Sequence, residues 1–269
     1  MVVIARILQP RTARLCASIA VAVLGLGSLY AQPHWIGSWA ASQQLVEPHN
    51  ALPADDLRDA TLRQIVHLSL GGSTLRVEIS NRFGTAPLHI TGVHIARPES
   101  AESAKIVAGT DKALAFSGAS DVTVPAGADY ISDPVPFSVA ALSDLVITLH
   151  LDTWPSEQTG HPGSRATSYI VHGDQLSATD LPHAKKVEHW YFIAGVGVDA
   201  TSYSAAVVTL GDSITDGHGA TENGNDRWPD ILARRLQARP DTRNVSVLNH
   251  GMLLTPGRLA ANSLSTNEL

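Results

Sequence analysis

The sequence predicts a two-part fold, in which a jelly-roll-like β-sandwich (residues 32–200) is followed by the start of a layered α/β domain (residues 201–269). Apolar and polar residues alternate with period two through much of 62–151, most clearly at Leu145, Ile147 and Leu149. This is the pattern of a strand with one buried face. Many short runs of this kind are separated by Gly and Pro, which is typical of a β-sandwich. Near Ala205 the pattern changes to apolar strand, helix and second apolar strand, which indicates an α/β fold.

Turns and shorter strands can also be placed within the β part. Gly71 and Gly72 lie between two alternating runs and predict a hairpin turn. Gly92 shifts the phase of the alternation between Ile90 and Val93, which predicts a β-bulge. We expect further short strands near residues 113–116, 122–124, 169–171 and 190–193.

The α/β part consists of three predicted elements. Residues 205–210, which are mostly apolar, predict a buried strand. Residues 228–239 predict a helix, because Pro229 suits its first turn and Pro240 ends it. Residues 245–248 predict the next strand. Whole doubly wound domains need roughly 100–200 residues, so we expect this β-α-β unit to be only the beginning of one.

Ser213 directly follows the first of these strands, in the run Gly211-Asp212-Ser213-Ile214-Thr215-Asp216-Gly217. A strand, a sharp turn, a serine and a helix form the arrangement by which α/β hydrolases expose a nucleophile. Such a turn places the hydroxyl at the carboxyl edge of the sheet, where ligands of open α/β sheets bind. We therefore predict that Ser213 is a catalytic nucleophile.

This run, together with residues 224–230 and 232–236, resembles the SGNH hydrolases, which are also called GDSL-type esterases and lipases. Two upstream segments, residues 35–42 and 161–168, resemble a secreted bacterial subgroup with an extra β domain before the catalytic one. The resemblance extends from Trp35 to about Gly251. It implies that residues 201–269 are the N-terminal part of a flavodoxin-like, three-layer α/β domain.

The resemblance also implies a mechanism. Ser213 would attack the acyl carbon of an ester and form an acyl-serine. The backbone N–H groups of Ser213 and Gly251 would form the oxyanion hole, and Asp212 would support the turn. The family also has an oxyanion asparagine and an Asp-x-x-His that supplies the base, and neither has a match after Gly251. We therefore expect the catalytic domain to be truncated and the activity of this chain to be weak.

Five other residues could be mistaken for the missing groups. Asn225 lies only twelve residues after Ser213, at the entry to the first helix, and Asp180 and His183 precede Ser213 in a loop that we place between the two parts. We interpret these three as structural. His250 lies near the expected edge of the sheet, as does His218, and an unusual base would have to come from one of these two.

The first 31 residues predict a secretory signal peptide. Three arginines precede an apolar run at residues 15–29 that is short for a membrane span. We expect a secreted or periplasmic protein with no stable membrane partner after cleavage. A retained N-terminal anchor helix is the alternative.

The composition disfavours several functions. The chain has 19 basic and 25 acidic residues; without the three arginines of the signal, its net charge is −9. This charge disfavours nucleic acid and anionic membranes as partners. Cys16 is the only cysteine, and the twelve histidines show no metal-ligand spacing, so we predict neither a metal nor another cofactor.

Three interpretations therefore remain. The first is a secreted serine ester hydrolase, truncated here, whose substrate is a small-molecule or polysaccharide ester, such as an acetylated polysaccharide or a short acyl ester. The second is a polysaccharide-binding β-sandwich module with a vestigial hydrolase stub. The third is an intact small enzyme with an unusual base. Covalent labelling of Ser213 by an ester-like probe separates the second from the other two.

Overall fold

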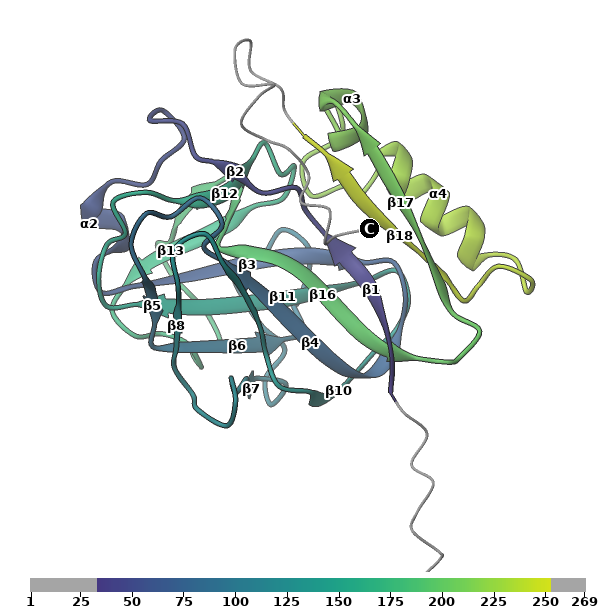
Figure 1. The fold of residues 1–269 in the computed structure, drawn as a ribbon, viewed down its shortest axis with the longest axis horizontal. Helices are drawn as coiled ribbons and strands as arrows, with labels where there is room; N and C mark the ends of the chain where they lie inside the picture. The colour runs from purple at the N-terminus through teal and green to yellow at the C-terminus, as the bar shows by residue number, and fades with distance from the viewer. Residues whose placement is uncertain (1–32, 253–269) are drawn as a thin grey trace, which may run out of the picture. The chain divides into compact units, whose positions relative to one another are not determined.

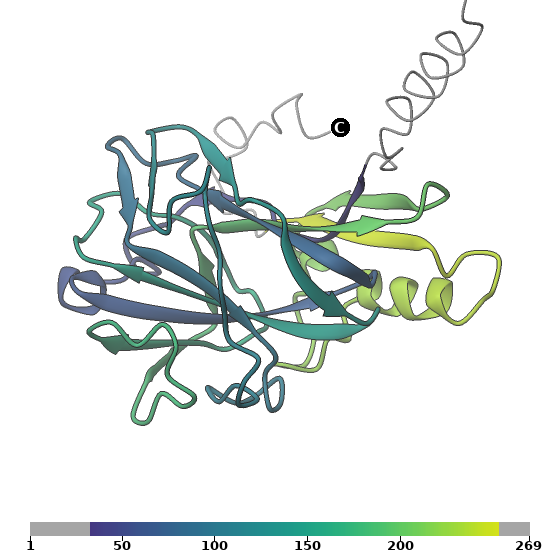
Figure 2. The same cartoon turned by 90° about the horizontal axis from the view of Figure 1, so that it is seen from below.

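Two antiparallel sheets make up most of the computed structural model, which describes residues 33–252 (Figures 1 and 2). The predicted signal peptide and residues 253–269 lie outside the described residues. The five-stranded sheet has the order β1 (His34–Ala40), β16 (Ile193–Ala200), β4 (Gly72–Ser80) and β10 (Val135–Val139), with β9 (Asp129–Ile131) also paired to β4. The six-stranded sheet has the order β14 (Lys185–Val187), β13 (Ser168–His172), β3 (Ala60–Leu68), β11 (Ser143–Leu151), β6 (Gly92–Ala96) and β7 (Lys112–Ala113).

The remaining strands form three smaller sheets. They are β15 (His189–Tyr191), β12 (Thr159–Pro162) and β2 (Gln44–Leu45); β5 (Leu88–Ile90) with β8 (Val122–Val124); and the pair β17 (Ala205–Gly211) and β18 (Val245–Gly251). The described helices are α2 (Ala54–Leu57), α3 (Ser213–Asp216) and α4 (Trp228–Gln237). None of the helices within residues 33–252 is long and apolar enough to cross a membrane.

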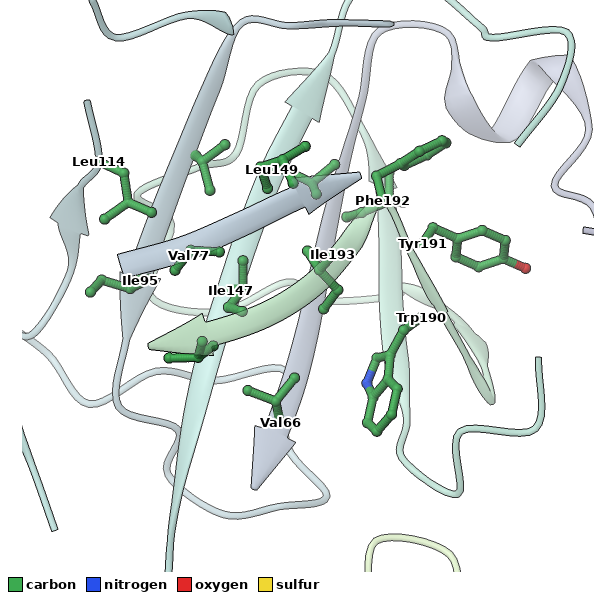
Figure 3. Close-up of a cluster of buried hydrophobic side chains, with 14 of the residues drawn as sticks. Val66, Val77, Ile95, Leu114, Ile147, Leu149, Trp190, Tyr191, Phe192 and Ile193 are labelled. Carbon is green, nitrogen blue, oxygen red and sulfur yellow. The ribbon is translucent and has the colours of Figure 1, made fainter. Parts of the chain in front are cut away.

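The hydrophobic core lies between the two large sheets. Val77 of β4 and Ile193 of β16 meet Ile147 and Leu149 of β11 and Val66 of β3 (Figure 3). Each such side chain contributes about 1.5–3 kcal/mol when it is fully buried. The predicted β-rich part before residue 201 is therefore confirmed.

The outer face of the six-stranded sheet is covered, although the alternation in β11 predicts only one buried face. Thr148 is 2% exposed and His150 is 6% exposed. Arg63, which is fully buried on β3, donates to Thr148 Oγ1 and to the carbonyl oxygens of Ala104 and Ala178 at 3.1, 2.7 and 2.7 Å. The guanidinium thus anchors two loops over this face, and its burial lowers the pKa of Arg63.

Two predicted turn features are wrong. Gly71 and Gly72 do not form a hairpin, because β3 and β4 lie in different sheets. A methyl group on Gly71 would lie 2.8 Å from the backbone at Ala141 N, so glycine there permits a close approach of two chain segments. Gly92 does not form a bulge either, since β6 pairs with β11 without a register shift. The chain instead changes partner there, from β8 to β11.

The predicted β-α-β elements are present after residue 204. β17 and β18 pair in parallel, and α4 packs against β18 (Figure 1). β18 also contacts β1, where a methyl group on Gly37 would lie 2.9 Å from Leu248 Cδ1. In addition, Val247 N donates to the Oγ of Ser69, directly after β3, at 3.0 Å. This unit therefore lies directly against the five-stranded sheet.

The prediction that the first strand of this unit is buried is wrong. Val207, Val208 and Leu210 of β17 are 38%, 37% and 51% exposed. Within residues 33–252, β17 pairs only with β18, so its other edge has no neighbouring strand. Its apolar composition is typical of a central strand of a parallel sheet, but burial depends on neighbours on both sides.

Candidate active site

Ser213 is the first residue of α3, immediately after β17 and the intervening Asp212. The Asp212 side chain accepts a hydrogen bond from Ile214 N at 3.0 Å, at the start of the helical turn. A methyl group on Gly211 would lie 2.1 Å from Thr215 Oγ1, so only glycine fits at the end of the strand. The turn closes at Gly217, whose φ of 125° strongly favours glycine. Ser213 is half-buried.

Gly251 lies beside this turn, opposite Gly211 in the register of β17 and β18. Its N–H donates to Asn249 Oδ1 at 3.0 Å, and the Asn249 amide donates to Thr215 O at 3.0 Å. A methyl group on Gly251 would lie 2.2 Å from Asp216 N. Gly251 thus packs directly against α3, but its N–H is bonded to Asn249, so its role as an oxyanion donor stays a prediction. Sequence reasoning missed Asn249, because it sits at an ordinary strand position.

A buried contact links α3 to the β-rich part of the chain. His161 of β12 is 2% exposed, and its Nε2 lies 2.7 Å from Asp216 Oδ1. On the other side of the ring, Nδ1 lies 2.7 Å from the carbonyl oxygen of Ser42. Burial by itself lowers the pKa of His161, but the Asp216 carboxylate raises it, and the pKa lies above its ordinary value. Sequence analysis singled out both residues, yet nothing in the sequence joined them.

The residues that follow His161 hold the chain beyond Asp216. Asn223 N donates to Arg165 O at 2.8 Å, and the Asn223 side chain exchanges hydrogen bonds with Thr167 N and Thr167 Oγ1 at 2.8 and 2.9 Å. Arg227, which is buried, donates to the carbonyl oxygen of Ser164 and lies over the Trp190 ring. Residues 161–167 therefore contact the segment 216–227 repeatedly.

Two concave regions flank β18. One is a groove of about 380 Å³ over the outer face of the five-stranded sheet, lined by residues that include Trp35, Arg76, Glu78, Leu248 and His250. The Arg76 guanidinium lies 4.1 Å from the centroid of the Trp35 ring. The other is a cavity of about 30 Å³ between β1, α4 and β18, beside His161 and Asp216.

The two histidines considered as an unusual base lie in different surroundings. His218 is exposed, and its backbone N–H donates to Ser213 O at 2.7 Å. His250 lines the groove and pairs in register with Leu210. Within residues 33–252, no group of three or more His, Cys, Asp or Glu side chains is arranged to hold a metal ion.

Of the three residues interpreted as structural, Asn225 bonds to the β-rich part, and Asp180 and His183 belong to it. Asn225 Nδ2 donates to Asp144 Oδ1 at 3.2 Å. Asp180 and His183 lie between β13 and β14 of the six-stranded sheet, not between the two parts of the chain as predicted. This loop joins two paired strands of one sheet, so it is a connection within the β-rich part and not a linker between the two parts.

The comparisons with known proteins bear on the last part of the chain. A family model described as GDSL-like Lipase/Acylhydrolase matches residues 207–265. No curated protein matches the chain. The matched region begins within β17 and includes Asp212, Ser213, Asp216 and Gly251. Over residues 207–265, the chain is therefore similar to the GDSL-like lipases and acylhydrolases, the SGNH hydrolase family that its sequence resembles.

Proposed function

We propose that the protein is a secreted serine ester hydrolase that works through an acyl-serine at Ser213. The observation that carries the proposal is the place of Ser213: it follows a parallel strand, begins a helical turn and lies within the family match. Ser213 Oγ attacks the acyl carbon, and the alcohol leaves with a proton. Water then cleaves the acyl-serine and releases the acid. We further propose that residues 201–269 begin a flavodoxin-like domain behind a jelly-roll-like sandwich.

The proposed substrate is an ester of a sugar or another short acyl ester. The groove of about 380 Å³ supports this choice, since small-molecule sites have volumes of about 300–1,000 Å³. Its lining combines an indole ring with the charged side chains of Arg76 and Glu78. Flat apolar surfaces beside hydrogen-bonding groups suit a sugar ring.

We propose that turnover by the 269-residue chain is slow. The Gly251 N–H donates to Asn249, so this oxyanion donor must first break a hydrogen bond. Removing one oxyanion donor costs about 10²–10³ in kcat. Hydrolysis of p-nitrophenyl acetate should therefore exceed the uncatalysed rate only modestly.

The test is labelling of Ser213 by a fluorophosphonate, with hydrolysis of p-nitrophenyl acetate in parallel. We expect the wild-type chain to be labelled and Ser213→Ala to be unlabelled and at background rate. Ser73→Ala is the matched control, because Ser73 is an exposed serine on β4. Equal labelling of wild type and Ser213→Ala would refute the proposal. Absence of labelling together with retention on acetylated xylan in affinity electrophoresis would favour the polysaccharide-binding module.

A further inference from the structure

We propose that the contact between His161 and Asp216 positions the Ser213 turn, so that the β-sandwich is part of the catalytic machinery and not a separable module. The inference rests on the proposed ester hydrolase function. His161 belongs to β12 of the three-stranded sheet, outside the family match. Asp216 is the last residue of α3, the helix that Ser213 begins.

The hydrogen bonds of His161 define where its protons are. A backbone carbonyl only accepts, so Nδ1, at 2.7 Å from Ser42 O, carries a proton. The 2.7 Å contact between Nε2 and Asp216 Oδ1 requires a second proton. In the imidazolium–carboxylate form both ring nitrogens donate, and charge-assisted hydrogen bonds of this kind are about twice as strong as neutral ones. The raised pKa of His161 agrees with this form.

A displacement of Asp216 would reach Ser213, because α3 is a single turn of helix. Asp216 N donates to Asp212 O at 3.0 Å, so the two ends of the turn are bonded to each other. The close approach of Gly251 to Asp216 N holds α3 from the β18 side. His161 holds it from the sandwich side, so α3 is fixed between two sheets. A misplacement of about 1 Å in a catalytic group can cost about 100-fold in rate.

Residues 164–167, which follow His161, also hold the chain that follows α3. The Asn223 side chain bonds to Thr167 N and Oγ1, and Arg227 donates to the carbonyl oxygen of Ser164. Residues 161–167 therefore contact the chain at Asp216, at Asn223 and at Arg227. Three attachments over twelve residues leave little freedom for the turn that carries Ser213.

His161 acts through Asp216 and is not itself the catalytic base. Both ring nitrogens have partners, and the side chain is 2% exposed. The charged and titratable groups around it are Arg227 and Asp230 from α4 and its start, His189 of β15, and His67 of β3, which pairs with Asp144. Burial lowers the pKa of His189, and the charge of His161 lowers it further. The adjacent cavity of about 30 Å³ has room for about one water and none for an ester.

The test compares His161→Gln and Asp216→Asn with a matched control. His94→Gln serves as the control, because His94 Nδ1 makes a similar contact to Asp111 at 2.9 Å within the six-stranded sheet. Three properties are measured in the 269-residue protein: hydrogen exchange of residues 211–218, the rate of Ser213 phosphonylation by a fluorophosphonate, and the kinetics of p-nitrophenyl acetate hydrolysis. We expect at least tenfold faster exchange and about 100-fold slower labelling in the first two variants. For p-nitrophenyl acetate, kcat should fall while KM stays unchanged. The control should stay within twofold.

Exchange and labelling that match the wild type in both variants would refute the positioning role. Faster exchange in the two variants, together with no labelling of the wild type by the fluorophosphonate, would support the positioning role and refute the ester hydrolase function. The two failures are therefore distinguishable. A fourth measurement needs no variant. Nitrogen-15 NMR of the wild-type histidines at pH 7 should show both nitrogens of His161 protonated. An unprotonated Nε2 opposite an ionised Asp216 would overturn the proposal, because the contact would then have no proton.

Discussion

Replacement of Gly251 by alanine should damage stability and catalysis together. The new methyl group would lie 2.2 Å from Asp216 N, 2.6 Å from Thr215 C and 2.7 Å from Asp216 Cα. All three are backbone atoms, so no side chain can rotate away. Favourable contacts need about 3.5–4.0 Å, so β18 and α3 must separate by roughly 1 Å or more. Overpacking of this kind costs about 1–3 kcal/mol of unfolding free energy, and the displaced turn should lower kcat about 100-fold.

The assay for Gly251→Ala is urea unfolding followed by circular dichroism, with the rate of Ser213 phosphonylation measured on the folded protein. Gly197→Ala is the control, because a methyl group there would meet nothing closer than 3.8 Å in the middle of β16. We expect its unfolding free energy to change by less than about 0.5 kcal/mol. Wild-type stability and labelling in Gly251→Ala would show that α3 does not press against the end of β18.

Two further predictions concern buried charges. Arg63→Met keeps the aliphatic volume but leaves two partly buried carbonyl oxygens without their donor, so the unfolding free energy in urea should fall by about 1–3 kcal/mol. An unchanged midpoint would contradict this role. The pKa of His161 is raised in the folded state above an unfolded value of about 6.5, so its stabilising contribution is complete below that pH and is lost as pH rises through the folded pKa. The difference in unfolding free energy between wild type and His161→Gln should therefore shrink on alkalinisation, and a constant difference from pH 6 to 10 would refute it.

Local patterns predicted the elements around Ser213 well. The apolar run before Gly211 became β17, and Pro229 and Pro240 bracket α4 as helix-start and helix-stop residues should. Each of these signals depends on neighbours within a few residues. The bond between Asp212 and Ile214 is of the same kind, because a short polar side chain satisfies a backbone N–H two residues away.

Tertiary relations could not be predicted in this way. The glycines at 71 and 72 are compatible with a hairpin, and only the pairing partners of β3 and β4 show that the chain crosses to another sheet. The alternation in β11 gives no sign that Arg63 covers its outer face. His161 and Asp216 are 55 residues apart, and neither the 3.6-residue nor the 2-residue period relates them.

The pairing of β1 with β16 means that β1 is synthesised long before the strand with which it pairs. His34 is opposite Ala200, so the first described strand meets its partner only after roughly 165 further residues have been made. At about 5–20 residues per second, β1 spends roughly 8–33 s without its neighbour. During that time Trp35, Ile36 and Trp39 have no strand to pair with. β18, which lies against β1, comes later still. The serine turn therefore cannot be held against β1 before β18 has been made, and a chaperone that shields β1 would act before that point.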